Sequence, residues 1–181
     1  MDKVFDFKIQ YKIGDDGQQL MVLRFPKELQ LQEGKNPDLK ILSTGDLVEL
    51  KTDTYSFSPI FSVSKKLTPN LFMEKYSDKD RQMIGGPWRA KSEGCKYFAY
   101  FFLNNDLLYL FETDTLVQLL DVIVLNMPLK NIPNKGWITQ GYPIHHKLLD
   151  PIGYSSVLSN GESFSFWCNG LETKLNRMEN E

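Results

Sequence analysis

Residues 37–52 read PDLKILSTGDLVELKT, and this stretch predicts a compact β-hairpin. Residues 38–42 are expected to form its first strand, residues 43–46 its turn, and residues 47–52 its second strand. Because the two strands run antiparallel, the start of the first strand lies beside the end of the second. The charged residues at these two places are therefore expected to meet.

Three charged side chains converge on this hairpin. Glu49 and Lys51 are expected on one face of the second strand and Leu50 in the core, because side chains alternate along a strand. The hairpin brings Asp38 back beside them. Two carboxylates can hold a hard cation such as Mg²⁺ and leave positions for water and a phosphate oxygen. Such a cation lowers the pKa of a bound water, and the Lys51 ammonium can orient that water or offset charge on the phosphate.

Downstream of the hairpin the sequence alternates between helical and extended patterns. Residues 53–70 are predicted as a long, functional loop. The pattern then predicts a strand at 71–76, a helix from Gly85-Gly86-Pro87 to before Gly94, strands at 97–103 and 107–111, and a helix capped by Thr113 or Asp114. We therefore expect an α/β (α+β) domain with a central mixed β-sheet flanked by helices.

The two ends of the chain carry other patterns. Residues 5–13 alternate apolar and polar side chains, a Gly-Asp-Asp-Gly turn follows, and residues 20–25 return, which predicts an N-terminal β-hairpin. Residues 26–33 are predicted as a short helix. Prolines and glycines from Pro128 onward predict a surface arm, and residues 171–181 a polar end. The expected organisation is a core of residues 1–145, including the hairpin, and an arm of residues 146–181 in the same domain.

Composition limits the class of protein. The chain has 181 residues, enough for one domain, and a formal net charge of -2. That charge excludes a uniformly basic protein but not a local positive channel for DNA. The two cysteines, Cys95 and Cys168, support neither a disulfide framework nor a zinc cluster, which favours a reducing cytoplasm. The longest apolar runs are too short to cross a bilayer, so a soluble, intracellular protein is expected.

The hairpin motif also resembles that of a known family. Pro37-Asp38, followed by Glu49-x-Lys51, is similar to the PD-(D/E)XK signature of restriction-endonuclease-like nucleases. Residues 48–53, 69–76, 85–90 and 97–102 together look like small phage-type nucleases of this superfamily, so the resemblance covers roughly residues 36–145. It implies a restriction-endonuclease-like core, metal ligation by Asp38, Glu49 and the Leu50 carbonyl, and Lys51 at the attacking water. The implied metal is Mg²⁺, with Mn²⁺ as a substitute.

One feature departs from the family pattern. Many relatives begin with a helix that carries an extra glutamate, whereas a hairpin is expected here. Glu28 and Glu33 are both candidates for that glutamate, and the sequence does not decide between them.

Several further residues have two interpretations. Glu74 is either another acidic group near the metal or a surface partner of Lys75 or Lys79, and Asp53 lies at the site rim or in a turn. The free backbone N–H groups at the start of the predicted helix, at Gly85-Gly86-Pro87, either bind a DNA phosphate or have no role beyond starting the helix. His145 and His146 have no third ligand at zinc spacing, so we expect no ligand role.

Basic side chains near the long loop are the candidates for contacts with the DNA backbone. They are Lys65, Lys66, Lys75, Lys79 and Arg81 around the loop, with Arg89 one turn into the following helix, and the alternative is that they are scattered surface charges. The sequence-based hypothesis is a Mg²⁺-dependent DNA endonuclease that works as a homodimer, since cutting both strands usually takes two sites. The rival is a non-catalytic DNA- or protein-binding module that retains the nuclease fold.

Overall fold

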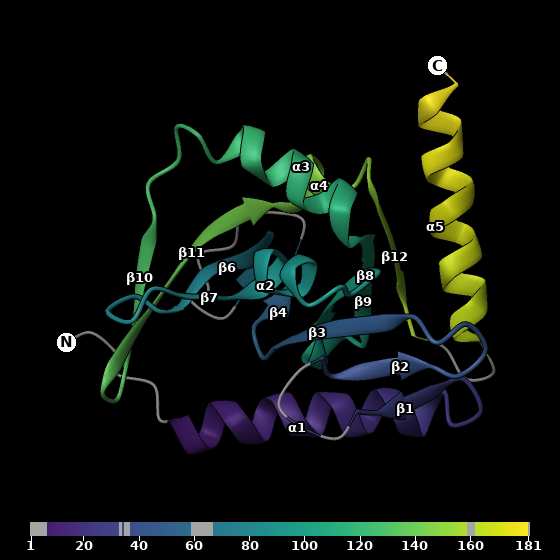
Figure 1. Ribbon diagram of the computed structural model, residues 1–181, viewed down its shortest axis with the longest axis horizontal. Coiled ribbons are helices and arrows are strands. Elements are labelled where there is room, and N and C mark those ends of the chain that lie inside the picture. The colour runs from purple at the N-terminus through teal and green to yellow at the C-terminus, as the bar shows by residue number, and fades with distance from the viewer. Residues whose placement is uncertain (1–6, 33, 35–36, 59–66, 159–161, 181) are drawn as a thin grey trace.

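The structure, a computed structural model, describes residues 7–32, 34, 37–58, 67–158 and 162–180. Its centre is a six-stranded sheet in the order β1-β2-β3-β8-β9-β12 (Figure 1). The strands are β1 (Leu29–Leu31), β2 (Leu39–Ile41), β3 (Leu47–Asp53), β8 (Tyr97–Phe102), β9 (Leu107–Glu112) and β12 (Gly153–Val157). β3 and β8 are parallel, and every other neighbouring pair is antiparallel. The predicted fold class, a central mixed sheet flanked by helices, is confirmed.

Different elements cover the two faces of this sheet. One face packs against helices α1 (Phe7–Arg24) and α5 (Phe164–Glu179), and the other against α2 (Gly86–Ser92) and α3 (Thr113–Ile123). That second face also packs against a four-stranded antiparallel sheet of β10 (Lys130–Asn134), β11 (Trp137–His145), β6 (Asn70–Asp78) and β7 (Met83–Ile84). The remaining elements are β4 (Ser56–Phe57), β5 (Leu67–Thr68), the 3₁₀ turn η1 (Leu103–Asn105) and α4 (His146–Leu149). No described helix is both long and apolar enough to cross a membrane.

The central strands form as their sequence predicts. All six residues of β8 are buried, and its alternate side chains enter the two cores on opposite faces. Asp106, in the left-handed conformation at φ 49°, closes the hairpin to β9. Helix α2 has its proline in the first turn, and Gly94 follows it at φ +74°. The predicted cap of α3 was wrong: the cap is Glu112, whose carboxylate accepts from the Thr115 N–H.

The predicted N-terminal hairpin is wrong, because residues 7–24 form the single helix α1. The residues predicted as its turn lie within the helix, and the first residues of its predicted first strand lie outside the described part. A Cβ at Gly17 would collide with the side chain of Thr52 on β3. Gly17 is therefore explained by the close passage of α1 over the sheet.

Two other local predictions are also wrong. The short helix expected at 26–33 is replaced by β1, which pairs with β2. The surface arm expected from Pro128 instead contributes β10 and β11 to the second sheet, and β12 to the edge of the first. Residues 171–180, expected as a polar end, belong mostly to α5, whose Phe164, Trp167 and Leu171 are fully buried.

Glu28 fixes the start of helix α5. Its carboxylate accepts hydrogen bonds from the Phe164 N–H at 2.7 Å, and from the Ser165 N–H at 3.0 Å and hydroxyl at 2.7 Å. Burial alone would raise the pKa of Glu28, but these hydrogen bonds together lower it. The carboxylate thus satisfies N–H groups that the first turn of a helix leaves without partners.

We expect Glu28→Gln to lower the free energy of unfolding by about 1 kcal/mol at pH 7, the usual value of a helix cap. A carboxyl whose pKa is lowered in the folded state stabilises the fold at pH values above its ordinary pKa of 4.5, and that stabilisation is lost on acidification. The difference between the two proteins in urea unfolding should therefore shrink below about pH 4. Glu179→Gln, in the exposed last turn of α5, is the matched control. Equal loss in both variants would contradict the capping role.

Candidate active site

The structure brings Asp38 and Glu49 together. Asp38 immediately precedes β2, in which Leu39 is paired with Val48 of β3, so Asp38 lies beside Glu49. Its Oδ2 accepts the Leu50 N–H at 2.8 Å. The Leu50 side chain points into the opposite core, as the alternation predicted.

The two neighbouring carboxyl groups repel each other when both are ionised. Burial raises the pKa of Asp38 to about 6, although the Leu50 hydrogen bond and Arg89 oppose the shift. Burial, followed by the negative charge of Asp38, raises the pKa of Glu49 to about 7 against the effect of Arg89. Such a pair holds its negative charge at neutral pH only with a cation close by.

Arg89 of α2 is one cation that the structure provides. Its guanidinium donates to Glu49 Oε1, and its Nε lies 3.9 Å from Glu93 Oε2. The Glu49 side chain is only 5% exposed, whereas that of Arg89 is 29% exposed. Burial opposes the charge of Arg89, but Glu49 and then Glu93 raise its pKa overall. Sequence reasoning missed this ion pair, because it joins residues 40 positions apart in different elements.

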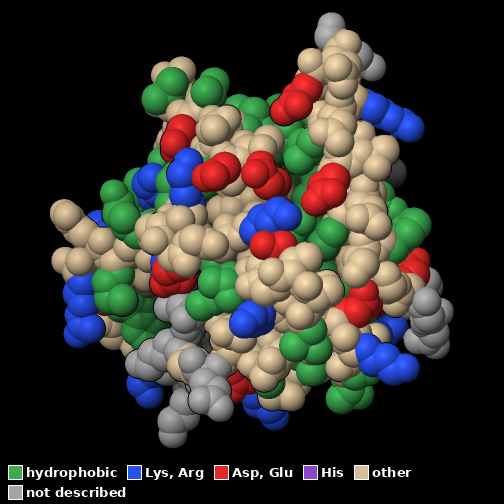
Figure 2. Space-filling model, turned by 45° about the vertical axis from the view of Figure 1, so that its right-hand side comes forward, with side chains coloured by type: hydrophobic (Ala, Val, Ile, Leu, Met, Phe, Trp, Pro, Cys, Tyr) green, Lys and Arg blue, Asp and Glu red, His purple; other side chains and the backbone are tan. Residues whose placement is uncertain are grey.

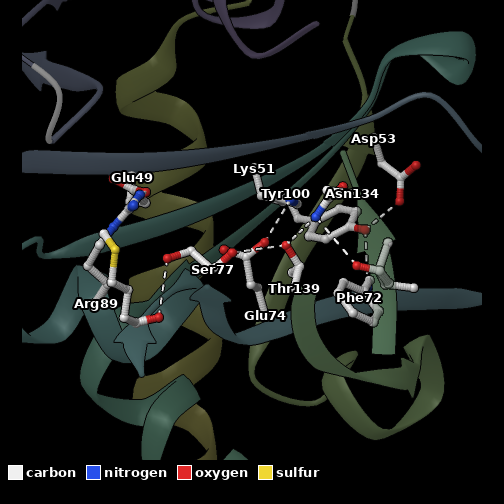
Figure 3. A network of polar contacts seen from close by, with 12 residues as sticks. Glu49, Lys51, Asp53, Phe72, Glu74, Ser77, Arg89, Tyr100, Asn134 and Thr139 are labelled. Atoms are coloured by element: carbon white, nitrogen blue, oxygen red, sulfur yellow. Dashed lines mark hydrogen bonds and ion pairs between the residues drawn. The ribbon is translucent and has the colours of Figure 1, made fainter. Parts of the chain in front are cut away.

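Lys51 lies on the same face of β3 as Glu49, as expected. Its Nζ is 3.5 Å from Glu74 Oε2 on β6, and its side chain is 37% exposed (Figure 3). Glu74 therefore lies at the site and pairs with a lysine other than the two considered from the sequence. A Cβ at Gly85 or Gly86 would collide with Glu74, so the two glycines allow α2 to start against β6.

Asp53 is the third residue of β3 on this face. Its carboxylate accepts the Tyr100 hydroxyl at 2.5 Å and the Tyr55 N–H at 2.8 Å, so both of its oxygens have structural partners. The Tyr100 oxygen in turn accepts the Phe72 N–H at 3.0 Å, which ties β8 to β6 (Figure 3). Asp53 thus anchors a turn and a buried tyrosine beside the site.

Helix α1 contributes a residue that the sequence did not single out. Gln18 donates from Nε2 to Asp38 Oδ1 at 2.6 Å, so the α1 side chain that contacts Asp38 is an amide. Glu28 is engaged at the start of α5, and Glu33 lies outside the described residues. The sequence predicted a β-hairpin where the structure has helix α1, so it did not place Gln18 near Asp38.

The residues predicted to contact DNA lie partly within and partly outside the described part of the chain. Lys65 and Lys66 lie outside the described residues. The Lys75 ammonium lies 4.1 Å from the centre of the Trp88 ring, and burial lowers the pKa of Lys75 although Asp121 opposes this. Arg89 is engaged with Glu49. Of the two histidines considered, His146 pairs through Nδ1 with Asp150 at 2.9 Å.

The residues present fit a divalent cation. Glu49 Oε2 is buried and has no hydrogen-bond partner among the described residues, while Oε1 is held by Arg89. An unsatisfied buried carboxylate oxygen is costly. Asp38 and Glu49 supply the hard oxygen donors that Mg²⁺ prefers, and the neighbouring carboxylates gain from its charge.

A groove on the described surface lies elsewhere, between α5 and the start of α3. It has a volume of about 500 Å³ and is lined on its polar side by Lys96, Glu112, Glu172 and Glu179. Figure 2 shows acidic side chains gathered around a basic one on the face beside α5. A polyanion such as DNA would be repelled from this face.

Comparison with known proteins returned no match. No protein-family model matches the chain, and neither the curated proteins nor the solved structures provide a significant match.

Proposed function

We propose that the chain is a Mg²⁺-dependent DNA endonuclease whose active site is formed by Asp38, Glu49 and Lys51. The observation that supports this most is the adjacency of Asp38 and Glu49, with one Glu49 oxygen lacking a partner among the described residues. Burial raises the pKa of Asp38 to about 6, and the ammonium of Lys51 is near enough to oppose part of that shift. The resemblance of the Pro37-Asp38 and Glu49-x-Lys51 motif to the PD-(D/E)XK signature points to the same three residues.

Each side chain has a task in hydrolysis of a phosphodiester. Asp38 and Glu49 would hold the cation, together with the Leu50 carbonyl. When bound, Mg²⁺ supplies Lewis-acid polarisation of the phosphate and lowers the pKa of water. Lys51 orients the attacking water or stabilises the charge that develops on the phosphate. Gln18 and the Leu50 N–H hold the Asp38 carboxylate in place, so they are positioning groups.

The rival function is a non-catalytic binding module with the same fold. The observation in its favour is that Glu49 and Lys51 both have partners within the chain, Arg89 and Glu74. Catalysis requires each of these pairs to open or rearrange when metal and substrate bind. A binding module would keep them closed, and Mg²⁺ would not bind at pH 7.

The proposal is tested with the full chain and labelled duplex, nicked, branched and single-stranded DNA in Mg²⁺, Mn²⁺ or EDTA. We expect metal-dependent cleavage that Lys51→Ala slows by about 100-fold or more, the usual cost of losing a group that stabilises developing charge. Lys135→Ala, in the exposed turn between β10 and β11, should cleave at the original rate. Absence of cleavage in either metal by folded protein would favour the binding module.

A further inference from the structure

Three potential metal ligands gather on the α2 side of Glu49. A carboxylate oxygen of Glu49, one of Glu93 and the sulfur of Cys95 all lie within 4.8 Å of one another. Glu93 ends α2, Gly94 turns the chain at φ +74°, and Cys95 leads into β8. β8 runs parallel to β3 as its direct neighbour, which brings this turn beside Glu49.

Two carboxylate oxygens of this group lack hydrogen bonds. Glu49 Oε2 and Glu93 Oε2 are both buried, and neither has a hydrogen-bond partner in the described part of the chain. The Glu49 side chain is 95% buried, since only 5% of it is exposed, and one of its carboxylate oxygens lies within 4.8 Å of the other two donor atoms. Cys95 is itself 5% exposed and forms no disulfide among the described residues. The Arg89 guanidinium lies close to both carboxylates, yet these two buried oxygens beside a thiol still lack a hydrogen bond, which favours a bound cation.

We propose that Glu49, Glu93 and Cys95 bind a zinc-type divalent ion, separate from the Mg²⁺ position at Asp38 and sharing Glu49 with it. A sulfur donor selects Zn²⁺ over Mg²⁺, which takes oxygen ligands. Zinc bonds of about 2.0 to 2.3 Å in a tetrahedral site place two donors about 3.3 to 3.8 Å apart. Donors already within 4.8 Å of one another therefore need to approach by about 1.5 Å at most.

Binding changes the protonation and pairing of these groups. In the metal-free protein, burial and then Glu49 raise the pKa of the Cys95 thiol to about 12. The ion binds Cys95 as the thiolate, so the thiol proton is released to solvent. Three protein donors leave a fourth tetrahedral position for water. Arg89 is the counter-charge that the ion replaces, and its partly exposed side chain can turn toward solvent.

The shared ligand gives the site a consequence that rests on the proposed nuclease function. Glu49 cannot serve both ions with the same oxygens, so zinc-type ions should inhibit Mg²⁺-dependent cleavage. The ion-binding site itself does not depend on that function, and it is tested by binding alone.

The experiment titrates metal-stripped full chain with Zn²⁺ by calorimetry, and with Co²⁺ by the near-ultraviolet absorption of a cobalt–thiolate bond. We expect one Zn²⁺ per chain and a thiolate band with Co²⁺. Cys95→Ser should abolish the band, and both Cys95→Ser and Glu93→Gln should weaken Zn²⁺ binding by more than about tenfold, since loss of an outer-shell partner alone costs that much. Cys168→Ser is the matched control, because the other cysteine is also buried and free.

Asp38→Asn separates the two metal positions. It should leave the cobalt–thiolate band in place while it abolishes Mg²⁺-dependent cleavage. Zinc that binds equally well to wild type and Cys95→Ser would overturn the inference and assign the ion to Asp38 and Glu49. Absence of Zn²⁺ binding to the folded wild-type protein, with its folding checked by thermal unfolding, would overturn the inference as well. A chain that binds zinc but cleaves no DNA would refute the nuclease and leave the zinc site standing.

Discussion

Arg89→Ala is expected to lower the free energy of unfolding at pH 7 by an amount that stays below about 3 to 5 kcal/mol, the cost of a fully ionised buried charge without its partner. Glu49 is 5% exposed and already lies beside Asp38, so water cannot stabilise its negative charge in place of Arg89. The loss has an upper limit, because Glu49 can take up a proton and become neutral. The variant should therefore recover part of its stability at lower pH.

A double-mutant cycle in urea unfolding measures this interaction. Glu49→Gln combined with Arg89→Ala should cost less than the two single changes added together, because the double variant has no unpaired buried charge. Arg81→Ala is the control: its side chain is 79% exposed and pairs with Asp78, so it should change stability by less than about 1 kcal/mol. If Arg89→Ala lowers the free energy of unfolding by as little as Arg81→Ala does, the buried ion pair does not contribute to stability.

In EDTA, the free energy of unfolding is expected to fall as pH rises from about 4 to about 7. The ordinary pKa values of Asp38 and Glu49 are 3.8 and 4.5, and in the folded chain they are raised to about 6 and about 7. Between these limits the folded state binds more protons than the unfolded state, so raising the pH favours unfolding. For Glu49 alone, the shift corresponds to a loss on the order of 3 kcal/mol.

Urea midpoints at several pH values, taken in EDTA, measure this loss. Asp38→Asn removes one acid and lowers the pKa of the other, so its curve should be much flatter than that of the wild type. Glu28 acts in the opposite direction and at lower pH, so its effect is distinguishable. A wild-type curve that is flat or rising between pH 5 and 7 would contradict the raised pKa values.

The hairpin, the central strands and helix α2 could be predicted because their signals are local. The turn at Gly45, the alternation from Leu47 to Thr52 and the start of α2 at Gly86 each lie within a few neighbouring residues. The adjacency of Asp38 and Glu49 follows from that hairpin alone. This local information was enough to identify the proposed catalytic residues.

The partners of those residues could not be predicted, since packing decides them. Gln18, Glu74 and Arg89 reach the hairpin from α1, β6 and α2, and no sequence spacing relates them to it. The approach of Glu93 and Cys95 to Glu49 depends on the parallel pairing of β3 with β8. Such contacts are properties of the assembled layers.

The misassigned ends have a physical cause as well. Glycine and aspartate disfavour helix, so residues 14–17 look like a turn until the contact between Gly17 and Thr52 is known. Pro143 argues against a strand in the sequence, but it lies beyond the last residue of β11 that pairs with β10. In both segments tertiary packing outweighed the local preference.

The hydrogen bonds between the Glu28 carboxylate and the start of helix α5 affect the order in which the chain folds. The contact joins residues 136 positions apart, whereas the hairpin of β2 and β3 joins neighbours. Closing a long loop costs conformational entropy before its contacts form, and topologies with distant contacts fold slowly. The hairpin that carries Asp38 and Glu49 can thus form early, and the docking of α5 completes the opposite face of the sheet late in folding.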